Sequence, residues 1–250
     1  MLASCWGAAV VCFALTLATA APPAQAQPAA RAFVSCSSDG QSAPRQLVER
    51  FLNADCEACW AQPATAGHPG ASGTAFVDWI VPGTQGDEAP LSAAALRDGL
   101  WRLQALGYST PAGMLARPVP PIPGAGAPRL RVAHGSAMLG HVAISVEMTP
   151  ARGGPWTVWV VLSERIDAGT DGSPQARDLV RGSLRIDWNA RAGVAAREGR
   201  GALPTQTGPW RERRVMQLPE GVRADRLRLT GWIEDAQGRV ASVVRSACPA

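Results

Sequence analysis

Residues 46–63 read QLVERFLNADCEACWAQP, and this stretch decides the expected fold. Its first half carries four apolar side chains, which indicates a buried strand over Gln46–Asn53, although periodicity alone also allows a helix. Cys56 and Cys59 follow the strand with the spacing Cys-x-x-Cys. We therefore expect a short helix that begins at the motif and is limited by Pro63.

A Cys-x-x-Cys motif between a strand and a helix is typical of thiol–disulfide chemistry. The first sulfur lies at the helix N-terminus, where unpaired amides and the helix dipole favour an anion. This environment lowers a thiol pKa, so Cys56 is the expected attacking thiol and Cys59, one turn on, the resolving one. The negative charge of Glu57 opposes a thiolate at Cys56. Such exchange needs no cofactor, and the sequence predicts none.

The cysteines predict two disulfides. Two of the six lie within the first 26 residues, and Cys36, Cys56, Cys59 and Cys248 remain. Four cysteines in an oxidising compartment allow three connectivities. We favour Cys56–Cys59 and a structural bond Cys36–Cys248 that ties the two ends of the chain together. Pairing of Cys36 with Cys56 or Cys59 remains open.

The first 26 residues are expected to be a signal peptide. They contain no acidic or basic side chain, and an apolar run over Trp6–Ala21 precedes the small-x-small sequence Ala24-Gln25-Ala26. This pattern predicts cleavage after Ala26 and export to the periplasm or out of the cell. An uncleaved membrane anchor is the alternative. No other run is long and apolar enough to predict a membrane span after cleavage.

The rest of the chain divides near residue 128. Residues 27–110 mix strands, the motif and a helix over Ser92–Leu106, and 111–128 hold six prolines and three glycines, which indicates a linker. Seven short apolar or alternating segments follow and predict an antiparallel β-sandwich-like domain over 129–250. These segments are Leu130–Val132, His141–Met148, Trp156–Leu162, Ser183–Trp188, Arg213–Leu218, Arg226–Glu234 and Arg239–Arg245.

Residues 47–63 resemble a family of exported bacterial proteins of unknown function that have a thioredoxin-like N-terminal half and a β-rich C-terminal half. The family pattern V-E-L-F-T-S-x-G-C-S-S-C-P-P matches here in its strand, its Phe and its Cys-x-x-Cys, but Asp55 replaces the Gly before the first Cys. Tyr108-Ser109-Thr110-Pro111 is similar to the family's Y-T-P. The resemblance implies an abbreviated thioredoxin-like domain over 27–110, with Pro111 as a cis proline facing the disulfide. The expected fold class is therefore α+β.

Composition excludes several functions. The chain has 250 residues, 46% hydrophobic and 18% charged, which excludes a disordered protein. All 24 basic residues are Arg and are interleaved with 20 acids, so no basic stripe predicts nucleic-acid binding. The absence of Lys excludes a lysine Schiff base. His134 and His141 lack a neighbouring carboxylate pair and are interpreted as ordinary residues.

Three functions fit these observations. The motif favours thiol–disulfide exchange, whose partners would be exported protein thiols or a redox partner. One alternative is a non-enzymatic envelope protein that is held by structural disulfides and binds a partner through its β domain. The other is a carrier of a soft metal, copper or zinc, through Cys56, Cys59 and His68, although a fourth ligand is missing.

Overall fold

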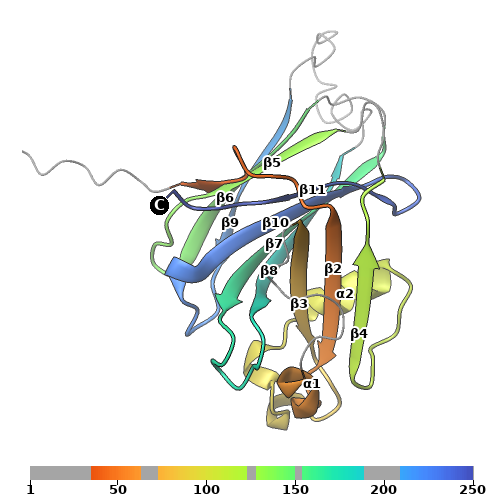
Figure 1. Ribbon diagram of the computed structural model, residues 1–250, viewed down its shortest axis with the longest axis vertical. Helices are drawn as coiled ribbons and strands as arrows, with labels where there is room; N and C mark the ends of the chain where they lie inside the picture. The colour runs from red at the N-terminus through yellow and green to blue at the C-terminus, as the bar shows by residue number, and fades with distance from the viewer. Residues whose placement is uncertain (1–34, 63–72, 123–127, 150–153, 189–208, 250) are drawn as a thin grey trace, which may run out of the picture. The chain divides into compact units, whose positions relative to one another are not determined.

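The computed structural model describes residues 35–62, 73–122, 128–149, 154–188 and 209–249 (Figure 1). These ranges contain eleven strands, two α-helices and three short 3-10 helices. The expected signal peptide over 1–26, and His68, lie outside them. Within the described ranges, no helix is both long enough and apolar enough to cross a membrane.

A seven-stranded sheet carries most of the fold. Its strand order is β11-β10-β7-β8-β3-β2-β4. The bounds are β2 (Gln46–Asn53), β3 (Thr74–Val81), β4 (Met114–Val119), β7 (Trp156–Ile166), β8 (Arg177–Trp188), β10 (Leu227–Glu234) and β11 (Val240–Arg245). β2 and β3 are parallel, from Gln46 opposite Thr74 to Asn53 opposite Val81. β8 joins β3 through a single parallel pair, Asp78 and Leu179.

This sheet shows that the expected α+β fold, a thioredoxin-like domain followed by a β-sandwich, is wrong. The strands expected in the first domain, β2 and β3, lie in one continuous sheet with β7, β8, β10 and β11, which come from the second. The described chain is mostly β, with only α1 (Glu57–Ala61) and α2 (Arg97–Ala105) as α-helices. Local patterns predicted the strands, but they do not show which distant strands become neighbours.

The expected linker over 111–128 contains a strand of the sheet, β4. It pairs antiparallel with β2, from Leu52 opposite Met114 to Leu47 opposite Val119. Pro118 lies within it, and proline lacks the amide that a central strand needs. β4 stands at the end of the strand order, so only one of its sides has to pair. The prolines therefore restrict this segment to an edge and do not prevent a strand.

A four-stranded sheet in the order β1-β5-β6-β9 packs on one face of the larger sheet. Its strands are β1 (Cys36–Ser37), β5 (Arg129–His134), β6 (His141–Thr149) and β9 (Trp210–Gln217). β6 alternates buried and more exposed residues. Its buried side chains, such as Val142 and Ile144, meet Val158, Val160 and Leu162 of β7 in one apolar cluster. All seven strands expected after residue 128 are confirmed, with ends shifted by a few residues.

The opposite face of the larger sheet packs on α2. Leu103 of this helix is buried with Trp79, Trp159 and Trp232. A Cβ atom on Gly99 would lie 2.6 Å from Cγ1 of Val81, so glycine permits the close approach of helix and sheet. The helix expected over Ser92–Leu106 is shorter than predicted. Its first residues, Ser92–Ala94, form the 3-10 helix η2, which precedes α2; the others are η1 (Gly86–Glu88) and η3 (Ala224–Arg226).

A buried ionic network stabilises this contact. Arg102 of α2 donates to both carboxylate oxygens of Glu49 at 2.8 Å each, and to Glu234 at 2.6 and 3.2 Å. The guanidinium also lies 4.7 Å from the ring centroid of Trp159 and 5.2 Å from that of Trp232. Arg102 is fully buried, and burial alone would lower its pKa, but the two glutamates raise it. The charge of Arg102 is thus fully compensated.

Candidate redox site

The candidate site lies where β2 ends and α1 begins. Cys56 is the N-cap residue of α1 and forms a disulfide with Cys59. Both predicted disulfides, Cys56–Cys59 and Cys36–Cys248, are therefore confirmed. Cys59 is buried, with 6% of its surface exposed, whereas Cys56 is only partly buried. Cys56 is thus the more exposed of the two bonded residues.

The sulfur of Cys56 accepts a hydrogen bond from the backbone. The amide of Cys59 lies 3.2 Å from Cys56 Sγ. A hydrogen bond to the charged form of an acid favours that form, so this amide is positioned to stabilise a thiolate at Cys56 once the disulfide opens. The amide of Cys56 itself donates to the carbonyl of Asn53 at 3.0 Å, which fixes the turn between strand and helix.

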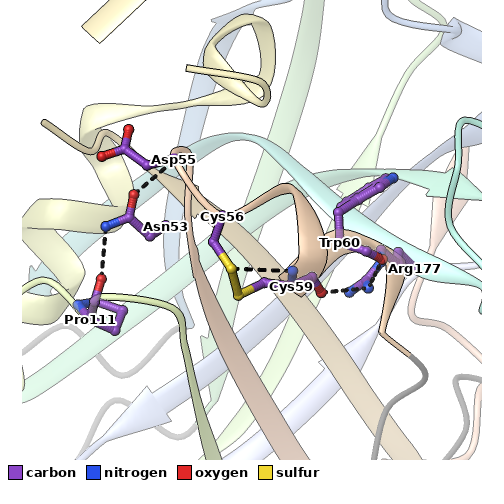
Figure 2. Close-up of a disulfide and its surroundings, with 7 residues drawn as sticks. All are labelled: Asn53, Asp55, Cys56, Cys59, Trp60, Pro111 and Arg177. Carbon is purple, nitrogen blue, oxygen red and sulfur yellow. Dashed lines mark hydrogen bonds between the residues drawn. A yellow bond between two sulfur atoms is a disulfide. The ribbon is translucent and has the colours of Figure 1, made fainter. Parts of the chain in front are cut away.

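Asn53, the last residue of β2, holds the segment beside the disulfide. Its side-chain amide donates to the carbonyl of Pro111 at 2.9 Å, and its backbone amide donates to that of Gly113 at 2.8 Å. Its side-chain oxygen accepts from the amide of Asp55 at 2.8 Å. Figure 2 shows Asn53, Asp55 and Pro111 together on one side of the disulfide.

The structure revises the expected role of Pro111. Gly154–Pro155 is the one cis peptide bond in the described ranges, so the Thr110–Pro111 bond is trans, against what the family resemblance implied. Gly113, rather than Pro111, lies against the sulfurs: a Cβ atom there would be 3.4 Å from Cys59 Sγ and 4.0 Å from Cys56 Sγ. Pro111 contributes to the site through its carbonyl, which accepts the hydrogen bond of Asn53.

On the other side of the disulfide, Arg177 holds the end of α1 (Figure 2). This residue begins β8, and its guanidinium donates to the carbonyl of Trp60 at 2.7 Å and to that of Cys59 at 3.5 Å. It also lies 4.5 Å from the ring centroid of Trp60, whose indole donates to the carbonyl of Asp171 at 2.6 Å. These contacts connect the short helix to strands from the second half of the chain.

Beneath α1 lies a buried group with an excess positive charge. Arg50 donates to Asp78 at 2.6 Å, and Arg177 lies 3.5 Å from the same carboxylate. All three side chains are at most 2% exposed. Burial lowers the pKa of Arg177, and the nearby Arg50 lowers it further, against the attraction of Asp78. Two guanidiniums face one carboxylate here, and the partly compensated cation lies next to the carbonyl of Cys59.

Sequence reasoning identified the two cysteines of the site but missed Asn53, Gly113 and Arg177. Arg177 is 118 residues from Cys59 in sequence and begins an apolar strand, so no local pattern connects it with the motif. Asn53 had a weak signal, because it is a polar residue at the end of an apolar strand. Gly113 lies within the proline-rich stretch that was interpreted as a linker.

The expected soft-metal ligands do not form a site within the described ranges. Cys56 and Cys59 are bonded to each other, and His68 lies outside the described ranges. The one group of three metal-ligating residue types found in those ranges is Cys36, His134 and Cys248, in which the two sulfurs form the second disulfide.

Comparison with known proteins does not assign the chain to a family. A scan against protein-family models finds none that matches the chain, and a search of curated proteins finds no match either.

Proposed function

We propose that the protein carries out thiol–disulfide exchange on the thiols of exported proteins through Cys56 and Cys59. The observation that supports this most is the asymmetry of the disulfide: Cys56 is partly exposed and receives an amide hydrogen bond, and Cys59 is buried. The two disulfides are compatible with an oxidising compartment, which supports export. The resemblance of residues 47–63 to exported proteins points the same way.

The exchange proceeds in two displacements. A substrate thiolate attacks Cys56 Sγ, a new sulfur–sulfur bond forms, and the bond to Cys59 breaks with Cys59 leaving as a thiolate. A second substrate thiolate then attacks the substrate sulfur of this mixed disulfide, and Cys56 leaves as a thiolate. The substrate gains a disulfide and loses two electrons, and the two cysteines gain them. The reverse sequence reduces a substrate disulfide.

The proposal is tested by trapping. In the chain from residue 27 onward, Cys59→Ser leaves the partly exposed Cys56 thiol, and Cys56→Ser leaves the buried Cys59 thiol. With glutathione disulfide as the probe, we expect Cys59→Ser to form a mixed disulfide at least about tenfold faster than Cys56→Ser, as measured by mass spectrometry. The variant in which Cys36 and Cys248 are both serine controls for the second disulfide and should still exchange.

The reduction potential gives the second readout. Equilibration of the wild type in glutathione buffers should place the Cys56–Cys59 pair above about −270 mV, in the range of known exchangers. Equal trapping rates in the two variants, or a potential below about −300 mV, would identify a structural bond and refute the exchange function.

Arg177 is predicted to raise the reduction potential of this pair. A buried cation next to α1 favours thiolates in the reduced state and so favours reduction. We expect Arg177→Met to lower the potential by about 30 mV, which corresponds to about one unit in a thiol pKa. The same glutathione titration measures the shift, and absorbance at 240 nm measures the thiolate pKa of Cys56 in the reduced protein.

Arg185→Met is the matched control for this prediction. Arg185 lies on the same strand, β8, but its side chain is 51% exposed and pairs with Asp187. The potential should not change in this variant. If Arg177→Met lowers the free energy of unfolding but leaves the reduction potential of the Cys56–Cys59 pair unchanged, Arg177 is only a structural contact of α1.

A further inference from the structure

A cavity of about 420 Å³ lies at the ends of β7, β10 and β11, where the chain approaches Cys248. Its lining does not include Cys56 or Cys59, and four of its twelve lining residues are arginines. The four guanidinium groups around it belong to Arg165, Arg226, Arg228 and Arg245. Two aspartates, Asp167 and Asp225, complete the charged lining.

The strand register puts three of these arginines in a row. Arg228 of β10 lies opposite Ser163 of β7. Arg165 lies two residues beyond Ser163 on β7 and is therefore a diagonal neighbour of Arg228. Arg245 of β11 lies opposite Thr230, two residues from Arg228. Side chains two residues apart on a strand share a face, and diagonal neighbours across strands lie within reach of long side chains. Three like charges therefore cross β7, β10 and β11 on one face of the sheet.

The acidic residues neutralise this row only in part, because Asp167 pairs with Arg165 at 3.9 Å and with Arg226 at 3.7 Å. The side chains of Asp167 and Asp225 are 59% and 70% exposed, and they lie at the rim. The side chain of Arg165, in contrast, is 21% exposed and lies deeper. Among the described residues, no ion pair or side-chain hydrogen bond involves the guanidinium of Arg228 or Arg245.

One buried carboxylate lies beside the row. Asp178 is 1% exposed, and within the described ranges neither of its oxygens has a hydrogen-bond partner. Its ion-pair contact is Nη1 of Arg165, at 3.6 Å. Burial lowers the pKa of Arg228, Asp178 opposes this effect, and Arg165 and Arg245 lower that pKa further. The four arginines outnumber Asp167, Asp225 and Asp178 by one, and the excess positive charge lies at Arg228 and Arg245, whose guanidiniums form no ion pair among the described residues.

We propose that this cavity is a binding site for a small organic or inorganic oxyanion, a polycarboxylate or a phosphate, that bridges Arg228 and Arg245. Guanidinium groups match the planar fork of a carboxylate and the oxygens of a phosphate with paired hydrogen bonds. The bound anion supplies the negative charge that the row lacks and removes the repulsion between its members. The cavity volume falls in the range of small-molecule sites.

Isothermal titration calorimetry tests this site with the chain from residue 27 onward. Citrate and inorganic phosphate are the two probes, used at constant ionic strength that is set with sodium chloride. We expect at least one of them to bind with a stoichiometry of one, and the comparison shows which oxyanion class the site takes. Arg228→Gln and Arg245→Gln should each weaken that binding by about tenfold or more. Arg228→Lys, which keeps the charge but loses the fork, should bind with intermediate affinity.

Arg129→Gln is the matched control, because it removes the same charge from an exposed position on β5 and should change the affinity by less than about twofold. Far-UV circular dichroism shows whether each variant is folded, and either of the two cavity variants alone is sufficient for the test. Failure of both probes to bind the wild type would overturn the proposal. Equal loss of binding in Arg129→Gln and the cavity variants would also overturn it, because it would indicate only general charge attraction. Neither outcome bears on exchange at Cys56.

Discussion

Replacing Cys36 and Cys248 together with serine is expected to lower the free energy of unfolding by about 5 kcal/mol. This disulfide joins residues 212 apart in the sequence. In the chain-entropy model, a crosslink stabilises the fold because it restricts the unfolded chain, and the effect grows with the length of the closed loop. Urea unfolding followed by circular dichroism measures the change.

The Cys56–Cys59 disulfide gives the internal comparison. It spans only three positions in sequence, so the same model assigns its loss about 2 kcal/mol. The double serine variant at Cys56 and Cys59 should therefore unfold at a higher urea concentration than the variant at Cys36 and Cys248. The opposite order would show that the Cys56–Cys59 bond is the main covalent support of the fold.

Arg102→Met is expected to lower the free energy of unfolding by about 3–5 kcal/mol. The substitution removes the cation between Glu49 and Glu234. Glu49 keeps its ion pair with Arg117 at 2.9 Å, but Glu234 stays buried without an ion-pair partner among the described residues. Trp159 and Trp232 also lose the guanidinium next to their rings. Urea unfolding at neutral pH measures the loss.

Two further variants separate the charge effect from lost packing. Arg131→Met breaks an ion pair with Asp39 whose side chains are 41% and 57% exposed, and should cost less than about 1 kcal/mol. The triple variant Glu49→Gln, Arg102→Met, Glu234→Gln removes all three charges but keeps an oxygen that accepts from the indoles of Trp159 and Trp232, and it should recover much of the stability. If the triple variant is no more stable than Arg102→Met alone, packing of the arginine side chain carries the effect.

The sequence predicts the local chemistry of the site well. The bounds of β2 and the pairing of Cys56 with Cys59 follow from a few adjacent residues, and both are confirmed. The turn over Asp235–Arg239 is equally local, because Asp235 accepts from the amides of Gln237 and Arg239 and Gly238 has a φ of 71°. In each case the determining interactions lie within a few positions of one another along the chain.

The arrangement of the sheet could not be predicted in this way. β3 pairs with β8, which lies about a hundred residues further along the chain, and no periodicity indicates which of several apolar strands will be its neighbour. β4, which lies in the proline-rich stretch 111–128, was missed because its position at an edge depends on the strands already beside β2. Arg177 contacts the carbonyls of Cys59 and Trp60 as a result of these pairings, so the charge next to the disulfide could not be predicted either.

The Cys36–Cys248 bond also determines how the protein responds to mechanical force. When the segments on either side of residues 36–248 are pulled apart, the tension passes from one sulfur to the other and bypasses every residue between them. All of the described strands lie within these limits. The part of the chain between residues 36 and 248 should therefore not lengthen under this force until a reductant has cut that bond.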